Sequence, residues 1–215
     1  MTIAHHPPDD LVLGLAAGRL RPAMALVLQV HVDGCTVCRA RLAELEAIGG
    51  VLLDDAGGVP LAVDALARTF ARLEAPLRAP LLHSDPLPMP PGVAWPERLR
   101  RCELTRWRRM APGMRWARAT LPEDRQAPLF LLRIAPGMSL ARHTHGQLEF
   151  TQVLCGSFDD GRAVFDAGDF DLADAQVHHQ PQVLEGAECV CLAYVENGLR
   201  YDSRLAGLVG RWIGL

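Results

Sequence analysis

Two groups of metal-ligating side chains lie in different halves of this sequence. In the first half, His31, Cys35 and Cys38 follow one another at spacings of four and three residues, and His5 and His6 stand upstream. Two thiolates and an imidazole suit Zn²⁺, which takes four ligands in structural sites. We expect His6, or in its place His5, to supply the fourth ligand by folding the N-terminal arm across the other three. The competing interpretation is that both cysteines are buried apolar side chains without a metal.

The second half carries a group of a different chemical kind. His143 and His145 are two residues apart, so that on a strand their side chains point to one face, and Glu149 follows four residues later. Two imidazoles and one carboxylate leave coordination positions open and suit Fe²⁺, Mn²⁺, Ni²⁺ or Zn²⁺. A further imidazole from a later strand, His178 or His179, would complete this site. The competing interpretation, surface histidines on a solvated strand, is the weaker one.

The residues that must position the first group are predicted to be helical. Apolar positions at helical spacing and capping residues indicate four helices within residues 1–75. The third starts near Cys35 and is predicted to end at Gly49 and Gly50, because glycine is a poor helix former. The fourth, over residues 61–74, is only weakly amphipathic. Together they form a small helical bundle that a zinc ion would hold together.

The chain changes character at a proline-rich stretch. Seven prolines exclude a helix or a central strand from residues 76–96, which are predicted to form an extended linker. Residues 97–215 show short apolar runs, the last of them Leu208–Ile213, separated by glycine, proline and aspartate about every ten residues. This rhythm is typical of a β-sandwich or barrel. The predicted fold class is therefore α + β, with residues 1–75 and residues 97–215 as two domains.

Composition and charge narrow the classes of function. A net charge of −3 and a pI near 6.2 give no basic excess that would favour direct binding to nucleic acid. The first residues show no secretory signal pattern, and no apolar run is long enough to span a membrane. We therefore expect a cytoplasmic protein in a reducing compartment, whose six cysteines are thiols or metal ligands and not disulfides.

The string from Gly137 to Gly156 resembles the first motif of the cupin superfamily at every defined position. In cupins the two histidines, the glutamate and a later histidine bind a metal inside a small jelly-roll β-barrel. The second cupin motif would begin at Gly168, and its spacing favours His179 over His178 as the later histidine. Three usual residues of that motif are replaced here, by Asp174, Gln176 and Val183. The resemblance implies a cupin β-barrel with a metal held by His143, His145, Glu149 and His179.

The first group resembles the zinc-binding anti-sigma domain, whose mark is His-x3-Cys-x2-Cys with an upstream histidine. On that resemblance the zinc ligands are His6, His31, Cys35 and Cys38. An anti-sigma domain, a linker and a cupin domain form the layout of the ChrR-type anti-sigma factors. This family implies a bacterial regulator, without catalytic residues, that binds an extracytoplasmic-function sigma factor and holds it away from RNA polymerase. Its cupin half is needed to respond to oxidative signals such as singlet oxygen or organic hydroperoxides.

Several points of mechanism stay open. Apolar faces of the first and fourth helices would contact the sigma factor, whose release would follow either a change transmitted from the cupin half or proteolysis in the linker. Alternatively, oxidation of Cys35 or Cys38 would eject the zinc ion. Cys189 and Cys191 share one face of a strand and are candidates for reaction with an oxidant, although a place in the core is favoured for them. The competing function is a dioxygenase-like cupin metalloenzyme with an N-terminal interaction module.

Overall fold

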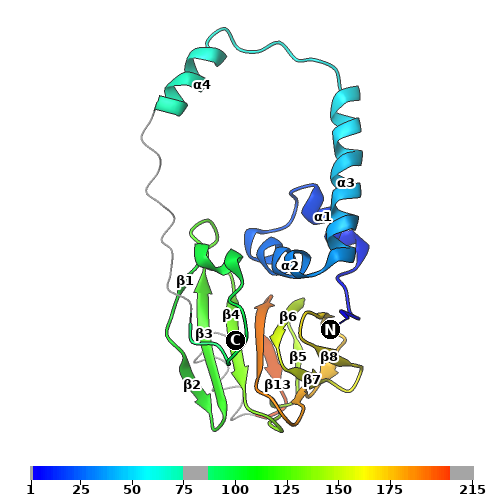
Figure 1. Ribbon diagram of the computed structural model, residues 1–215, viewed down its shortest axis with the longest axis vertical. Coiled ribbons are helices and arrows are strands. Elements are labelled where there is room, and N and C mark those ends of the chain that lie inside the picture. Colours follow the sequence, from blue (N-terminus) through cyan, green and yellow to red (C-terminus); the bar gives the residue numbers. More distant parts are fainter. Residues whose placement is uncertain (1, 75–86, 204–215) are drawn as a thin grey trace.

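The computed structural model describes residues 2–74 and 87–203. Helices occupy the first of these segments and strands the second, with a helix packed against a β-sandwich (Figure 1). The predicted α + β fold class is confirmed. Residues 76–86 of the predicted linker and the predicted strand Leu208–Ile213 lie outside the described residues.

Four α-helices form the N-terminal part: α1 (Asp9–Ala16), α2 (Pro22–Gly34), α3 (Thr36–Asp55) and α4 (Ala65–Glu74). Pro22 occupies the first turn of α2, where its missing N–H has no helical partner to lose. Cys35 separates α2 from α3 in an extended conformation, and its Sγ caps α3 by accepting a hydrogen bond from the N–H of Cys38 (3.4 Å). Gly18, with a φ of 61°, turns the chain after α1.

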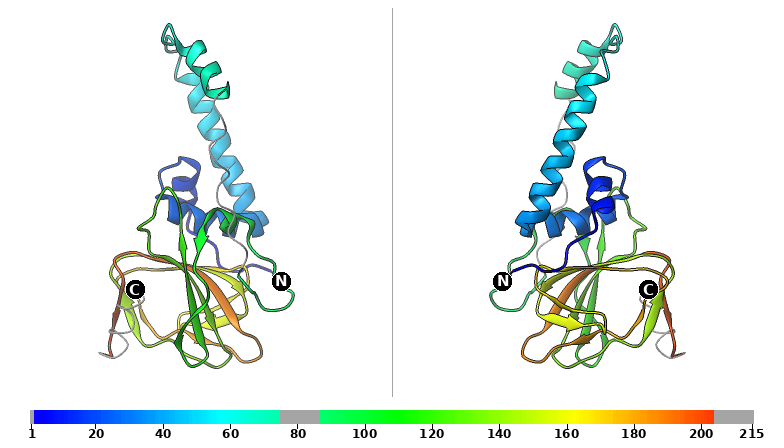
Figure 2. Two further views of the ribbon diagram at one scale, coloured as in Figure 1. Left: turned by 90° about the vertical axis from the view of Figure 1, so that its left-hand side faces the viewer. Right: turned by 90° about the vertical axis from the view of Figure 1, so that its right-hand side faces the viewer.

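The helix α3 differs from the prediction, because it continues through Gly49 and Gly50 to Asp55. Each glycine within a helix costs only about 1 kcal/mol relative to alanine. Residues 42–47 before the two glycines, and Leu52 and Leu53 after them, are good helix formers. With 20 residues, α3 is about 30 Å long, and its second half projects away from the sandwich (Figures 1 and 2). Neither α3 nor any other helix in the described part of the chain is long and apolar enough to span a membrane.

Antiparallel strands form the C-terminal part, after a short 3-10 helix η1 (Glu97–Arg101). The large sheet has the order β1-β3-β4-β12-β6-β9, with β2 paired to β3. Its strands are β1 (Glu103–Leu104), β2 (Arg108–Ala111), β3 (Met114–Thr120), β4 (Leu129–Ile134), β6 (Glu149–Cys155), β9 (Phe170–Ala173) and β12 (Cys189–Val195).

Two small sheets, β10-β5-β13 and β11-β7-β8, complete this part. Their strands are β5 (His143–His145), β7 (Ser157–Asp159), β8 (Val164–Asp166), β10 (His178–His179), β11 (Gln182–Val183) and β13 (Leu199–Tyr201). The strands thus form a sandwich of separate sheets and not one continuous closed barrel.

The helix α2 packs on the outer face of the large sheet, so that the helical and the β part share one core. Its buried side chains, among them Leu26 and Leu28, contact a cluster that includes Leu192 and Tyr194 of β12. The alternate residues of β12 belong to a second cluster inside the sandwich. Every residue of β12 is buried because the strand is covered on both faces.

Substitution of Leu28 by alanine tests this shared core. Leu28 is 0% exposed, so the cavity left behind should lower the free energy of unfolding by about 2–5 kcal/mol. We expect urea to unfold the helices, followed by circular dichroism, and the β part, followed by tryptophan fluorescence, at one lowered midpoint. The exposed Leu52→Ala on α3 is the control and should change the free energy by less than about 0.5 kcal/mol. Two separate transitions would contradict the shared core.

Candidate metal centres

The first group of predicted ligands comes together where the N-terminal arm, α2 and α3 meet. Ligand atoms of His6, His31, Cys35 and Cys38 all lie within 4.8 Å of one another. His31 belongs to the last turn of α2, Cys35 directly follows that helix, and Cys38 lies in the first turn of α3. Nδ1 of His6 lies 3.4 Å from each of the two sulfur atoms. The structure therefore gathers two nitrogens and two sulfurs from three segments.

Of the two histidines in the arm, His6 lies in this cluster and His5 does not. Nε2 of His5 is 3.1 Å from the backbone carbonyl oxygen of Val164. The ring of His5 also lies against Phe165, with 4.6 Å between the ring centroids. His5 thus contacts the β part while its neighbour faces the cysteines.

The donor atoms of this cluster fit a zinc ion. Nε2 of His31 is buried and has no hydrogen-bond partner among the described residues, and burial lowers the pKa of this histidine, which keeps the ring neutral. Burial, together with the adjacent Cys35 thiol, raises the pKa of Cys38 to about 12. The thiolate form of Cys38 therefore depends on a cation close by. Two sulfurs and two imidazole nitrogens in so small a volume match the composition of a tetrahedral zinc site.

The second group of predicted ligands lies inside the sandwich, where β5, β6 and β10 meet. His143 and His145 are on β5, Glu149 begins β6, and His179 is on β10 directly opposite His143. Their ligand atoms also lie within 4.8 Å of one another. All three histidines are buried. Residues from three strands therefore converge on one point, although β5 and β10 belong to a small sheet and β6 to the large sheet.

Each of the three imidazoles turns its Nδ1 to an oxygen atom outside the cluster. The acceptors are the carbonyl oxygen of Ala141 for His143 (2.8 Å), that of Asp174 for His145 (3.1 Å) and the Asp160 carboxylate for His179 (3.2 Å). These contacts turn Nε2 of each ring toward the cluster, where Nε2 of His143 and Nε2 of His179 lie 3.1 Å apart. Histidine ligands of metals are commonly oriented in this way, by a hydrogen bond from the ring nitrogen that does not bind the metal.

Glu149 brings a negative charge to the cluster. Its Oε2 lies 2.7 Å from Nε2 of His145, yet the pair lacks hydrogen-bond geometry, and neither atom has a hydrogen-bond partner within residues 2–74 and 87–203. Burial raises the pKa of Glu149, but the surrounding imidazoles outweigh burial and bring this pKa to about 2. The carboxylate is therefore ionised. A carboxylate oxygen and three imidazole nitrogens that face one another fit a divalent cation.

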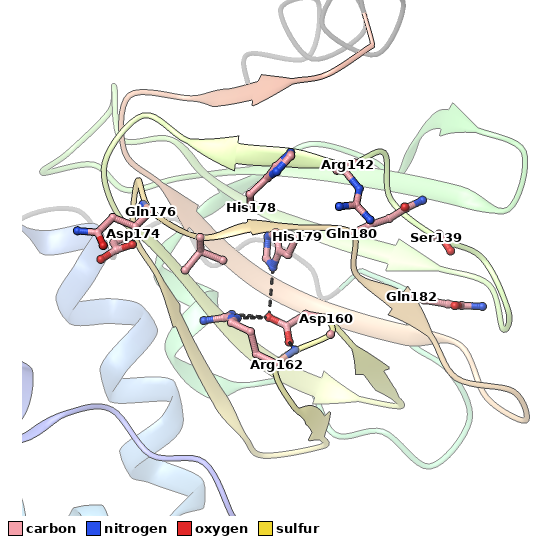
Figure 3. A pocket seen from close by; sticks show the side chains of 12 residues that line it. Ser139, Arg142, Asp160, Arg162, Asp174, Gln176, His178, His179, Gln180 and Gln182 are labelled. Carbon is pink, nitrogen blue, oxygen red and sulfur yellow. Dashed lines mark hydrogen bonds and ion pairs between the residues drawn. The ribbon is translucent and has the colours of Figure 1, made fainter.

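A charged group behind His179 lies outside the motifs that predicted the ligands. The buried Asp160 accepts a hydrogen bond from His179 and forms an ion pair with Arg162, as Figure 3 shows. Arg162 also contacts the carboxylate of Asp171 at 2.8 Å, and burial raises the pKa of Asp171 to about 6. Asp160 precedes Gly161 in a stretch that is typical of an exposed turn, so no local signal in the sequence indicates its role.

A polar hollow of about 730 Å³ opens beside His179. Arg142 and Arg162 contribute guanidinium groups to its wall (Figure 3). The exposed His178 also lines the hollow, and its Nε2 lies 3.1 Å from the carboxylate of Asp202. The structure thus places His179 in the metal cluster and His178 at the surface.

Cys189 and Cys191 border the second cluster from within the sandwich. A cavity of about 40 Å³ is lined by both cysteines and also by Glu149 and His179. The two sulfur atoms are 3.6 Å apart. The adjacent Cys189 thiol and burial raise the pKa of Cys191, so Cys191 is a protonated thiol. Both side chains are buried in the core and yet face the cavity that the metal ligands share.

Comparisons with known proteins cover both parts of the chain. A family model described as the ChrR cupin-like domain matches residues 97–197. The anti-sigma-E factor ChrR of Cereibacter sphaeroides is 38% identical over 211 residues, which are 97% of each chain. A chain in the crystal structure of Rhodobacter sphaeroides SigE in complex with the anti-sigma ChrR matches with a TM-score of 0.71 and 35% identity, covering 91% of this chain and 100% of that one. The similarity therefore extends through the helices and the strands alike.

Proposed function

Because this chain belongs to the ChrR family of anti-sigma factors, we propose that it binds an extracytoplasmic-function sigma factor and holds it away from RNA polymerase. The family predicted from the two ligand motifs is confirmed, as is the cupin fold of the β part. The observation that carries the proposal is the similarity, over nearly the whole chain, to anti-sigma factors, one of which was crystallised with SigE. The chain acts as a regulator and not as an enzyme, and its place of action is the cytoplasm, where RNA polymerase works.

The exposed apolar faces of α3 and α4 form the surface that we assign to the sigma factor. On α3, Val51, Leu52 and Leu53 are 67%, 66% and 75% exposed. On α4, Leu66 and Phe70 are exposed as well, and no residue of this helix is buried by the rest of the described chain. Apolar side chains exposed in such number mark an interaction surface.

The first helix takes a smaller part in this surface. Val12 is buried where α1 packs against α2 and α3, which leaves Leu13 on the exposed side. A sigma factor held by the projecting helices α3 and α4 cannot at the same time dock on RNA polymerase with the same surface. Inhibition is therefore steric and requires no chemical reaction.

We assign a metal ion to each of the two clusters. Zn²⁺ is assigned to the cluster of His6, His31, Cys35 and Cys38. A second divalent ion, Zn²⁺, Fe²⁺, Mn²⁺ or Ni²⁺, is assigned to the cluster of His143, His145, Glu149 and His179. The first ion cross-links the arm, α2 and α3, and metal binding of this kind adds directly to the stability of a small domain. The predicted boundaries, residues 1–75 and 97–215, remain the proposed division between the anti-sigma and cupin domains.

The response to singlet oxygen or an organic hydroperoxide belongs, in this proposal, to the cupin part. A hydroperoxide that reaches the cavity beside Glu149 meets Cys189 and Cys191, and one of the two thiols must lose its proton before its sulfur attacks. The O–O bond of the hydroperoxide then breaks and an S–S bond forms, and the two thiol protons leave in an alcohol and a water molecule. The sulfurs must approach from 3.6 Å to about 2.05 Å, which distorts β12. Since β12 also contacts α2, this route favours release by a conformational change over proteolysis of the linker.

Replacement of Phe70 by aspartate tests the sigma-binding surface. A charge on the apolar face of α4 should weaken sigma-factor binding at least about 30-fold, the effect of losing a contact worth about 2 kcal/mol. Pull-down of co-expressed candidate sigma factors identifies the partner, and titration measures its affinity. The matched control is Val164→Asp, because Val164 is an exposed apolar residue of β8. Equal affinities of the two variants would refute the assigned surface.

Elemental analysis of the purified chain should find two divalent metal ions for each chain. Cys35→Ser should remove the zinc ion and abolish sigma-factor binding, because the arm, α2 and α3 lose their cross-link. His143→Ala should remove the other ion and leave the zinc ion in place. Cys102→Ala, a buried cysteine outside both clusters, should retain both ions. Full zinc content in Cys35→Ser would show that the first assignment is wrong.

The double substitution of Cys189 and Cys191 by serine tests the redox proposal. This variant should bind the sigma factor and both metals normally, yet no longer release the sigma factor when an organic hydroperoxide is added. Size-exclusion chromatography of the complex before and after treatment measures the release. Cys155→Ser, on the neighbouring strand β6, should respond like the unaltered chain. Undiminished release from the double variant would exclude these thiols as the sensor.

A further inference from the structure

The N-terminal metal cluster touches the β part through His31. Nδ1 of His31 lies 3.0 Å from Oε1 of Gln152, a residue of β6 that is only 3% exposed. The Nε2 amide group of Gln152 donates to the carbonyl oxygen of Val153 (3.0 Å). Since a carbonyl oxygen can only accept, this bond determines which way the amide points. Oε1 of Gln152 must then accept from His31, which places the proton on Nδ1 and leaves the lone pair on Nε2 for the cluster.

The N-terminal arm is held by the β part at a second place. The backbone N–H groups of Ala4 and His5 donate to Oδ1 of Asp169, at 2.7 and 3.0 Å. The backbone N–H of Phe170 donates to the carbonyl oxygen of His5 (3.1 Å). The other carboxylate oxygen of Asp169 accepts from the N–H of Asp166 (2.9 Å), and Asp169 is 2% exposed. These bonds anchor the arm immediately before His6, the residue that faces both cysteines.

The strand β6 and its neighbour β9 turn their other face to the second metal cluster, to which β6 contributes Glu149. Side chains alternate along a strand, so Glu149 and Thr151 of β6 face the interior of the sandwich, whereas Gln152 faces α2. On β9, which pairs with β6, Asp171 lies opposite Thr151, and Phe170 lies opposite Gln152. Only two residues separate Glu149 from Gln152 along β6. The two clusters therefore stand back to back across one pair of strands.

We propose that Gln152 and Asp169 of the cupin part are positioning residues for the N-terminal metal site, which both domains thus build together. Gln152 orients the ring of His31, and Asp169 places the arm so that His6 reaches the ion. The inference rests on the proposed zinc site. Loss of such an outer contact commonly weakens metal binding about 10–100-fold.

Cobalt(II) binding to the full chain tests this inference. Charge transfer from thiolate to cobalt reports the N-terminal site alone, because the ligands of the other cluster include no cysteine. We expect Gln152→Ala to lose cobalt to a competing chelator about 10–100-fold more readily than the unaltered chain. Asp169→Ala should also lose cobalt more readily than the unaltered chain. Gln182→Ala, at an exposed position of β11, is the control and should retain cobalt normally.

Two further variants separate positioning from packing. Gln152→Glu keeps an oxygen acceptor for Nδ1 of His31 and should retain cobalt close to the level of the unaltered chain. Gln152→Leu keeps the volume without the acceptor and should lose cobalt as Gln152→Ala does. Circular dichroism checks that each variant is folded before the titration. Retention by Gln152→Leu equal to or above that of Gln152→Glu would overturn the positioning role.

The outcomes also distinguish this inference from the metal assignment beneath it. If the unaltered chain gives no thiolate band with cobalt, the N-terminal metal site itself is refuted and the inference with it. If the unaltered chain gives the band and every Gln152 and Asp169 variant retains cobalt equally well, only the positioning role is refuted.

Discussion

The packing of α2 against the outer face of β6 and β12 is the contact on which the other features depend. Small helical domains bury a limited apolar surface, and here α2 adds its apolar side chains to the core of the sheet. The same contact brings His31, at the end of α2, next to β6. It also explains why β12 is an uninterrupted apolar run, since a strand covered on both faces has no solvent-facing positions.

The strands β6 and β9 lie between the two clusters and contact both. Because successive side chains of a strand point to opposite faces, Glu149 and Gln152 serve different clusters although they are close in sequence. Communication between distant sites generally needs packed elements that both sites can bias. Here only one layer, the strand pair β6 and β9, separates the two clusters. A change at either cluster therefore acts on this shared pair of strands.

Local spacing predicted which residues the structure brings together, because Cys35 and Cys38 belong to one helical turn and cupin ligands to neighbouring strands. The contacts that residues outside the cluster make with the ligands and with the N-terminal arm could not be predicted in this way. Gln152 is 121 residues from His31, and Asp169 is 164 residues from His5, so their partners depend on how α2 docks on the sheet. The end of α3 was mispredicted for another reason, since glycine propensity is a weak preference that good helix formers on both sides override.

The exposed helices α3 and α4 depend on the region where the N-terminal arm, α2 and the start of α3 meet, which is called the base of the helical part. A helix of 10 residues such as α4 is marginal in water without tertiary contacts, and the described chain leaves apolar side chains of α3 and α4 exposed. The stability of α3 must come from its packing on α1 and α2 beside the metal cluster, and that of α4 from the partner. A partner that orders such helices loses affinity by the free energy of ordering them. Loosening the base therefore weakens binding without any change in the surface that the partner touches.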